Sequence, residues 1–275
     1  MADWDKAIDL GNYGQSNRHW GGMHINPAVF FPTAIIAFAV ILFSLIAPKA
    51  SADLFAGLRS GAVAHFDWFF MMSGNLLLIF CVVVALSPLG KIRLGGKGAT
   101  PDYSRLSWFA MLFGAGMGIG LVFYGVGEPV THFTSSMAGG PAAPLGGAVG
   151  DAQAARSIAM AATIFDWALH PWAICAVTGL ALALFSFDFK MPLSMRSAFY
   201  PLLGKAVWGR TGDVIEVLAV LATIFGLATS LGLGAQQAMA GIVYLYGIAN
   251  SSLTILALIA VMAGITFLSV RGGID

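Results

Sequence analysis

Long apolar runs separated by short polar segments dominate this 275-residue chain. A helix that crosses the hydrocarbon core of a bilayer needs about 20 predominantly apolar residues. Six runs reach that length and are predicted as membrane-spanning helices, at about 27–47, 66–87, 106–133, 157–185, 214–233 and 253–269. Residues 51–65 are predicted as a short interfacial helix or a loop. The fifth run continues into a glycine-interrupted stretch that ends near Ile248.

Composition supports an all-α integral membrane protein and excludes other classes. Hydrophobic residues make up 58% of the chain and charged residues only 10%, and the mean hydropathy is +0.83. Soluble domains carry about a quarter charged residues. A net charge of +1 cannot build the basic face that a nucleic-acid partner requires. Cys81 and Cys175 both lie in apolar runs and suggest no disulfide framework.

The distribution of Lys and Arg between the loops predicts the orientation in the membrane, because cytoplasmic loops carry the excess of these residues. Two loops are basic, with the cations Lys91, Arg93, Lys97 and Arg105 at 88–105, and Lys190, Arg196, Lys205 and Arg210 at 186–213. The loop at 134–156 holds only Asp151 and Arg156, and 234–252 has no charge. Both the polar N-terminal segment 1–26, which lacks the pattern of a signal peptide, and the ends of the even-numbered helices are therefore predicted to be cytoplasmic.

The third run contains glycine at every second position of GAGMGIG, residues 114–120. Each interior glycine costs a helix about 1 kcal/mol relative to alanine, so this run is predicted to unwind. Unwound backbone inside a bilayer must line a cavity or be buried in protein, and transporters use such discontinuous helices to bind ions and substrates. A second interpretation is close helix packing through two small-xxx-small pairs, Gly114/Gly118 and Gly116/Gly120. A dinucleotide-binding fingerprint fails, because the sixth position is not glycine.

The fourth run carries Trp167 and Trp172 around Pro171. Proline has no N–H, so the Trp167 carbonyl loses its helical donor and the helix is predicted to kink. On a continuous helix Trp167, Trp172 and Cys175 would fall within an arc of about 140°. Two indoles on one face would suit a quaternary ammonium ligand through cation–π attraction. The alternative is an interfacial belt of tryptophans, although Trp167 is deep for that role.

Three motifs together resemble the betaine/choline/carnitine transporter family: GAGMGIGLVFYGVGEPVTHF at 114–133, DWALHPWA at 166–173 and IFGLATSLGLGAQQ at 224–237. The resemblance implies twelve helices in a leucine-transporter-type fold of two inverted five-helix repeats, preceded by two extra helices. It also implies a homotrimer in the bacterial cytoplasmic membrane. The chain would then comprise the segment 1–26, the two extra helices and a basic loop at 27–104, and four helices of the first repeat at 105–275.

The resemblance also implies residue roles. Residues 116–120, including Gly116, Met117, Gly118 and Gly120, would contact the substrate's carboxylate end. Trp167 and Trp172 would belong to an aromatic box around trimethylammonium, with Phe123 lining the path and Cys175 at a wall position. In sodium-coupled members, carbonyls near Gly114 and Met117 help hold one sodium ion, and Thr223 corresponds to a residue near a second cation site.

Three departures from the family pattern bear on function. Cys175 stands where the family usually has tyrosine, Asp166 stands where it usually has histidine, and the second repeat is absent. We therefore expect a fragment, or a partner chain that supplies the rest. The predicted function is secondary active transport of a quaternary ammonium compatible solute, with glycine betaine favoured by Gly120, or choline or carnitine, coupled to sodium or protons. The alternative is a non-transporting subunit or an inactive fragment.

Asp166 supports two further hypotheses. A charged residue at the centre of a spanning helix is costly and usually faces a cavity or a partner. Asp166 is predicted either to pair with His170 one turn on or to cap backbone near Pro171, or else to carry a proton or offset cation charge. A membrane enzyme built on Asp166 and His170 is disfavoured, because a metal would need further ligands and Glu128 and His132 lie at the far end of the third run. No enzyme activity and no cofactor are expected.

Overall fold

The computed structural model describes residues 13–14, 17–20, 23–96, 98–116, 118–141, 143–249 and 251–272. Within these residues, five helical runs are long and apolar enough to cross a membrane: Pro27–Ile46, Pro48–Leu86, Ala152–Asp188, Arg210–Tyr246 and Ser252–Arg271. The prediction of a helical, multi-pass membrane protein is confirmed. The predicted third span at 106–133 is not among the five, and the structure divides it into two helices.

The chain forms two compact units, each described by itself. Unit 1 comprises residues 1–100 and 164–222, and unit 2 comprises residues 101–163 and 223–275. The unit boundaries cut through two helices, α5 and α9, and they differ from the segment boundaries expected from the family resemblance. Those expected segments remain a prediction.

Unit 1 begins with a small antiparallel hairpin of β1 (Arg18–Trp20) and β2 (Met23–Ile25). Helix α1 (Pro27–Ile46) follows directly, and the Asn26 side chain caps it by accepting a hydrogen bond from the Ala28 N–H at 3.1 Å. Proline at the first helical position fits this start, because its missing N–H would have no helical acceptor.

Helix α2 (Pro48–Leu86) is 39 residues long and corrects the expectation for residues 51–65. These residues are neither a loop nor a separate interfacial helix, because they continue into the predicted second span without a break. No proline follows Pro48 before the helix ends, and the isolated glycines in this stretch do not interrupt it. A 3₁₀ turn, η1 (Pro88–Lys91), follows α2.

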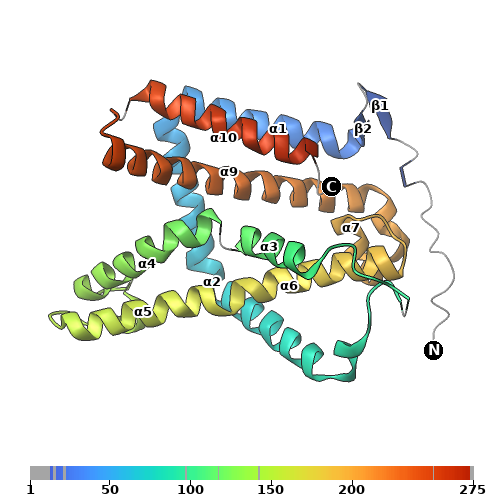
Figure 1. Cartoon of the computed structure of the whole chain (residues 1–275), viewed down its shortest axis with the longest axis horizontal. Helices are drawn as coiled ribbons and strands as arrows, with labels where there is room; N and C mark the ends of the chain where they lie inside the picture. The colour runs from blue at the N-terminus through green and yellow to red at the C-terminus, as the bar shows by residue number, and fades with distance from the viewer. Residues whose placement is uncertain are drawn as a thin grey trace. The chain divides into compact units, whose positions relative to one another are not determined.

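The predicted fourth span is divided at its proline. Helix α5 (Ala152–Ala168) ends one residue before Leu169, and α6 (His170–Ala183) begins one residue after it. Leu169 has φ −126° and ψ −41°, outside the regular helical range. Helix α6 continues into a π-helical turn, η3 (Leu184–Asp188). In unit 1, α6 packs across the middle of α2 (Figure 1).

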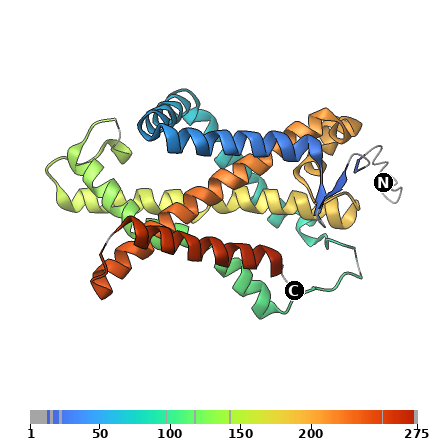
Figure 2. The ribbon, with the colours of Figure 1, turned by 90° about the horizontal axis from the view of Figure 1, so that it is seen from above.

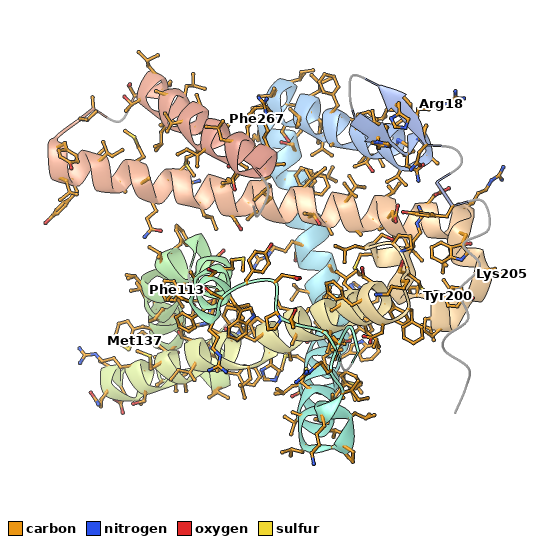
Figure 3. The ribbon with its side chains drawn as sticks, turned by 45° about the vertical axis from the view of Figure 1, so that its right-hand side comes forward. Arg18, Phe113, Met137, Tyr200, Lys205 and Phe267 are labelled. Carbon is orange, nitrogen blue, oxygen red and sulfur yellow. The ribbon has the colours of Figure 1, made fainter. Side chains whose placement is uncertain are left out.

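The connection from α6 to α9 (Arg210–Tyr246) is folded rather than a simple basic loop. It contains three short helical turns, α7 (Met195–Ala198), α8 (Tyr200–Leu203) and η4 (Gly204–Trp208). Tyr200 and Lys205 lie in this segment (Figure 3). We call residues 191–216 the Arg196 cap.

Arg196 is the centre of the cap and only 1% exposed. Its Nε and Nη2 lie 2.7 Å from the two carboxylate oxygens of Glu216, and Nη2 also donates to Asp213 Oδ1 at 2.9 Å. A third nitrogen, Nη1, donates to the Val207 carbonyl oxygen at 3.4 Å. The Tyr13 ring covers the guanidinium, with 5.1 Å between Arg196 Cζ and the ring centroid.

The same contacts shift two pKa values. Burial by itself lowers the pKa of Arg196, but the hydrogen bonds to Glu216 and Asp213 outweigh it and raise the pKa above its ordinary value. Burial, followed by the negative charge of Glu216, raises the pKa of Tyr13 against the opposing effects of Arg196 and Ser194. The cap is therefore held by a fully charged guanidinium beside a neutral phenol.

Unit 2 contains α3 (Arg105–Gly116), α4 (Ile119–Ala138), the 3₁₀ turn η2 (Pro144–Gly146), the later part of α9, and α10 (Ser252–Gly272). The predicted glycine interruption after residue 233 is wrong. Helix α9 is continuous to Tyr246 (Figures 1 and 2). Its glycines are flanked by alanine and leucine, which favour helix, and Gly247, with φ +64°, follows its last residue.

Candidate substrate site

The glycine motif breaks the third helix as predicted. Helix α3 ends at Gly116 and α4 begins at Ile119, while Gly118 at the start of α4 has extended backbone, with φ −67° and ψ −150°. Met117 lies outside the described residues. Four glycines within seven residues interrupt this helix, whereas the more widely spaced glycines of α9 leave α9 continuous.

Close helix packing explains the motif less well than unwinding does. A Cβ built on Gly114 would meet no atom within 4 Å in the part of the chain that the structure describes. A Cβ on Gly118 would lie 3.2 Å from the Gly114 carbonyl oxygen, a neighbour within the motif itself. Among its described residues, unit 2 therefore shows a local reason for glycine at position 118 and no partner helix that requires glycine at position 114.

The start of α4 is tied to α9 within unit 2. The Gln237 side chain donates a hydrogen bond from Nε2 to the Val122 carbonyl oxygen at 3.2 Å. Phe123, the predicted path residue, follows Val122 and packs edge-on against Tyr124 with 5.1 Å between ring centroids. Gln237 ends the third of the sequence motifs, but no pattern in the sequence indicated which helix its side chain would contact.

The break at Leu169 brings the two predicted tryptophans into direct contact within unit 1. The Trp172 indole N–H donates to the Trp167 carbonyl oxygen, with 2.9 Å between Nε1 and the oxygen. This carbonyl is the one that Pro171 deprives of its helical donor. The side chain of Trp172 thus replaces the missing backbone N–H, and one hydrogen bond fixes the orientation of its ring.

Trp167, Trp172 and Cys175 do not lie on one helical face as a continuous helix would place them. Because the chain breaks between Trp167 and Trp172, the predicted common arc does not hold for Trp167. Trp172 and Cys175 lie three residues apart on α6, about 60° around the helix, and share a face. Both are exposed in the structure, Trp172 at 44%. The indole ring therefore has a free surface although its N–H is used.

The predicted pair between Asp166 and His170 is wrong. His170 Nε2 lies 3.2 Å from Asn75 Oδ1 on α2, and its buried Nδ1 has no hydrogen-bond partner among the described residues. The helix also breaks between positions 166 and 170, so the two residues do not share one helical face. This removes the basis of the enzyme hypothesis.

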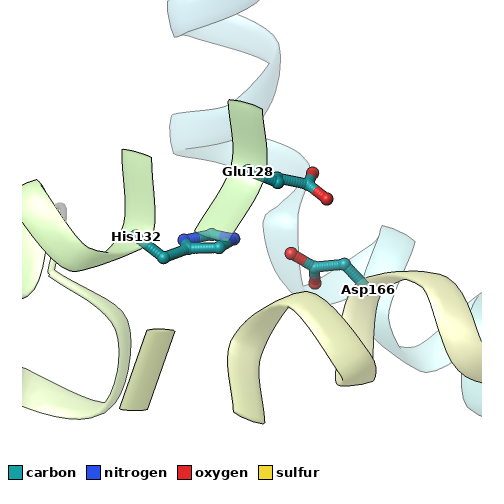
Figure 4. A group of neighbouring side chains, drawn as sticks. All are labelled: Glu128, His132 and Asp166. Carbon is teal, nitrogen blue, oxygen red and sulfur yellow. The ribbon is translucent and has the colours of Figure 1, made fainter. Parts of the chain in front are cut away.

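Glu128, His132 and Asp166 have side chains of the types that can bind a metal ion. Glu128 and His132 lie one turn apart on α4, and Asp166 lies near the end of α5 (Figure 4). The first two belong to unit 2, and Asp166 belongs to unit 1.

Two residues of α2 were missed. Asn75 and the buried Gly74 face the start of α6, and a Cβ on Gly74 would lie 3.6 Å from His170 Cδ2. A signal was present, because an amide inside an apolar span is costly and usually has a partner. The sequence pattern did not identify that partner, which lies 95 residues further along the chain.

The predicted site residues divide between the two units. Asp166, Trp167, Trp172 and Cys175 belong to unit 1, and the glycine motif, Phe123 and Thr223 belong to unit 2. Each unit thus presents one interrupted spanning segment with predicted site residues at its break. Thr223 lies on α9, exposed and away from either break in sequence.

Comparison with known proteins agrees with this architecture. Residues 28–275 match the model of the BCCT, or betaine/carnitine/choline family transporter. The chain is 50% identical over 265 residues to a glycine betaine/proline/choline transporter of Vibrio parahaemolyticus, covering 92% of this chain and 47% of that protein. It is 46% identical over 272 residues to glycine betaine transporter 1 of the same organism, covering 98% and 51%.

A more distant relative is the high-affinity choline transport protein of Escherichia coli, 39% identical over 254 residues that cover 91% of this chain and 36% of that protein. The chain spans about half the length of the first two of these relatives. Since the family model covers nearly all of the chain after the N-terminal segment, the chain belongs to the betaine/carnitine/choline family of transporters, a family of transporters and not of enzymes.

Proposed function

We propose that the protein containing this chain is a secondary transporter of a quaternary ammonium compatible solute, with glycine betaine the leading substrate. The observation that carries the proposal is the Trp172 ring, which is pinned by its own N–H at a proline break and keeps an exposed face. An aromatic face in a desolvated site attracts a quaternary ammonium by about 2 kcal/mol. Relatives named for glycine betaine and choline support this substrate class.

The broken third helix supports a role for the glycine motif. Helix ends inside a membrane present unpaired N–H and carbonyl groups, the first suited to an anionic group and the second to a cation. We assign the N–H groups at residues 116–120 to the substrate carboxylate, as the family resemblance implies. Gly120 leaves room for a zwitterion in this assignment.

Coupling to sodium or to protons is part of the same proposal. Carbonyls freed near Gly114 and Met117 would bind one sodium ion, and Thr223 would lie near a second cation site, as in sodium-coupled members. Asp166 would carry a proton or offset cation charge where the family pattern has histidine. An Asp166→Asn variant then loses the pH dependence of uptake, or shifts its preference from cations towards zwitterions.

We further propose a homotrimer in the bacterial inner membrane with a cytoplasmic N-terminus. The Lys and Arg residues of the loops at 88–105 and 186–213 support this orientation. Gly98, which is exposed in the first of these loops, offers a test. A Gly98→Cys variant should resist an impermeant thiol reagent added to intact cells, and labelling from outside would contradict the orientation.

Uptake of labelled glycine betaine tests the function directly. The complete reading frame that contains this chain is expressed in a bacterial strain that lacks its own compatible-solute transporters. Trp172→Leu should weaken binding by about 1–2 kcal/mol, the scale of one desolvated cation–π contact, without loss of expression.

Trp68→Leu is the matched control. Trp68 also donates its indole N–H to a backbone carbonyl, that of His65 at 3.1 Å, and it is 59% exposed on α2. Its loss should leave binding unchanged. No uptake by the wild-type reading frame would favour the inactive or non-transporting alternative, and equal effects of the two leucine variants would show that Trp172 is not part of a site.

A further inference from the structure

His170 and Asn75 form a hydrogen bond between two side chains that joins α6 to α2 in unit 1. Asn75 Nδ2 donates to the Met71 carbonyl oxygen at 2.8 Å, one turn back on α2. This bond uses the amide N–H₂ group and leaves Oδ1 facing His170. His170 Nε2 must therefore be the donor in the contact at 3.2 Å.

His170 is held from several sides. Gly74 faces the imidazole, and a Cβ at this position would lie 3.6 Å from His170 Cδ2, which is an ordinary van der Waals contact. The Phe165 ring, on the other side of the helix break, lies 4.8 Å from the imidazole centroid. Further along α6, the Cys81 thiol lies 3.8 Å from the Ala173 carbonyl oxygen. The start of α6 is thus clamped between α2 and the end of α5.

The clamp determines the direction in which the opposite face of α6, with Trp172 and Cys175, points. Successive residues of a helix are rotated by about 100°, so Trp172 lies about 200° and Cys175 about 140° around the axis from His170. When His170 faces α2, these two side chains face away from it. Their exposure in the structure agrees with this geometry.

We propose that His170 is a positioning residue, and that its hydrogen bond to Asn75 aims the Trp172 and Cys175 face of α6 at the quaternary ammonium substrate. The inference rests on the proposed function. His170 itself contacts α2 and α5 rather than substrate, so it acts on substrate binding through the orientation of α6. Pro171 frees the backbone at this point, which makes a side-chain anchor necessary.

Four variants test the clamp through the KM for glycine betaine uptake. His170→Leu and Asn75→Leu each remove the hydrogen bond, and each should raise KM about 3- to 20-fold, the range that interhelical hydrogen bonds in membranes span. The double variant should raise KM no further than either single one, because both remove the same bond. His170→Gln, whose amide nitrogen reaches the Nε2 position, should restore KM to near the wild-type value, and kcat should change little throughout.

A second measurement does not depend on transport. Cys175 shares the Trp172 face, so its rate of maleimide labelling in a Cys81→Ser background reports the orientation of α6. The rate should change in His170→Leu and Asn75→Leu but not in His170→Gln or in the control Gly74→Ala. Unchanged labelling in both leucine variants would overturn the clamp.

The outcomes separate the two proposals. If Trp172→Leu raises KM while His170→Leu and Asn75→Leu leave it unchanged, the substrate site stands and the positioning role is overturned. If Trp172→Leu leaves KM unchanged, the proposed site fails, and the positioning of substrate by His170 fails with it, whatever the labelling shows about α6.

Discussion

The Arg196 cap and the break at Leu169 are two irregular segments of the same unit. They differ in how their polar groups find hydrogen-bond partners. In the cap, one buried guanidinium satisfies two carboxylates and a backbone carbonyl, and Val207 beside it is fully buried. At the break, a single carbonyl is satisfied by a side chain whose ring stays exposed. The cap buries its polar groups in a closed network, whereas the break leaves the ring surface of Trp172 available to a ligand.

This difference implies that the cap stabilises the fold and that the break serves substrate binding. Substitutions in the cap should lower the stability of the protein and leave substrate selectivity unchanged. Substitutions at the break should change binding and cost little stability, because fewer buried groups depend on each residue.

Arg196→Met should cause the largest loss of stability. Removal of one partner of a buried ion pair leaves uncompensated charge and typically costs about 3–5 kcal/mol. Glu216 and Asp213 would lose their cation, and their side chains are only 15% and 25% exposed. Thermal unfolding of the purified protein in detergent measures the effect. Lys49→Met, which breaks an ion pair whose side chains are 89% and 67% exposed, should leave the transition unchanged.

Gly212→Ala should be the next most damaging change in the cap. A Cβ on Gly212 would overlap the Val207 carbonyl oxygen, so the backbone of the cap would have to shift. Overpacking of this kind costs about 1–3 kcal/mol or more. Gly226→Ala on the same helix meets no described atom within 4 Å and should instead stabilise α9 slightly. Equal transitions for the two variants would contradict the account of the cap.

Trp172→Phe should have a smaller effect on stability than either cap variant. Phenylalanine keeps an aromatic face but cannot donate to the Trp167 carbonyl, and an unmade hydrogen bond of this kind costs about 1 kcal/mol. Thermal unfolding should shift only slightly, while KM for glycine betaine should rise because the ring is no longer fixed. A stability loss as large as that of Arg196→Met would mean that the break is a structural core like the cap.

The smallest predicted effect is the contribution of Tyr13 to stability, which depends on pH. The pKa of Tyr13 is raised in the folded protein, so its contribution is fully present below pH of about 10, the ordinary pKa of tyrosine, and is lost as pH rises through the higher folded value. The difference in tyrosinate absorbance between the wild type and Tyr13→Phe isolates this residue. A component that titrates at or below the ordinary value would show that Tyr13 is not buried beside Glu216.

Local chemistry was enough to predict both breaks. Proline at position 171 and glycine at four positions of seven act on the backbone within a few residues, so the sequence reveals their effect. The same reasoning failed for α9 because it treated scattered glycines like clustered ones. It also missed the continuity of α2 through residues 51–65, where moderate polarity does not prevent a helix.

Partners distant in sequence could not be predicted. Arg196 was counted as one cation of a cytoplasmic loop, but its charge is buried against carboxylates 17 and 20 residues further on and against Tyr13 near the N-terminus. His170 was paired with its neighbour Asp166, whereas the structure places it on Asn75. In each case the residue type was informative and the identity of the partner depended on tertiary packing.

We propose that the exposed aromatic face at the α5–α6 break recognises a quaternary ammonium by its charge. The most direct test is competition against labelled glycine betaine by its carbon analogue, in which a tert-butyl group replaces trimethylammonium at nearly the same size. The account predicts that choline and unlabelled glycine betaine compete and that the carbon analogue does not, with Trp172→Leu reducing this discrimination. Equal competition by glycine betaine and its carbon analogue would show that the site recognises shape alone and would contradict the account.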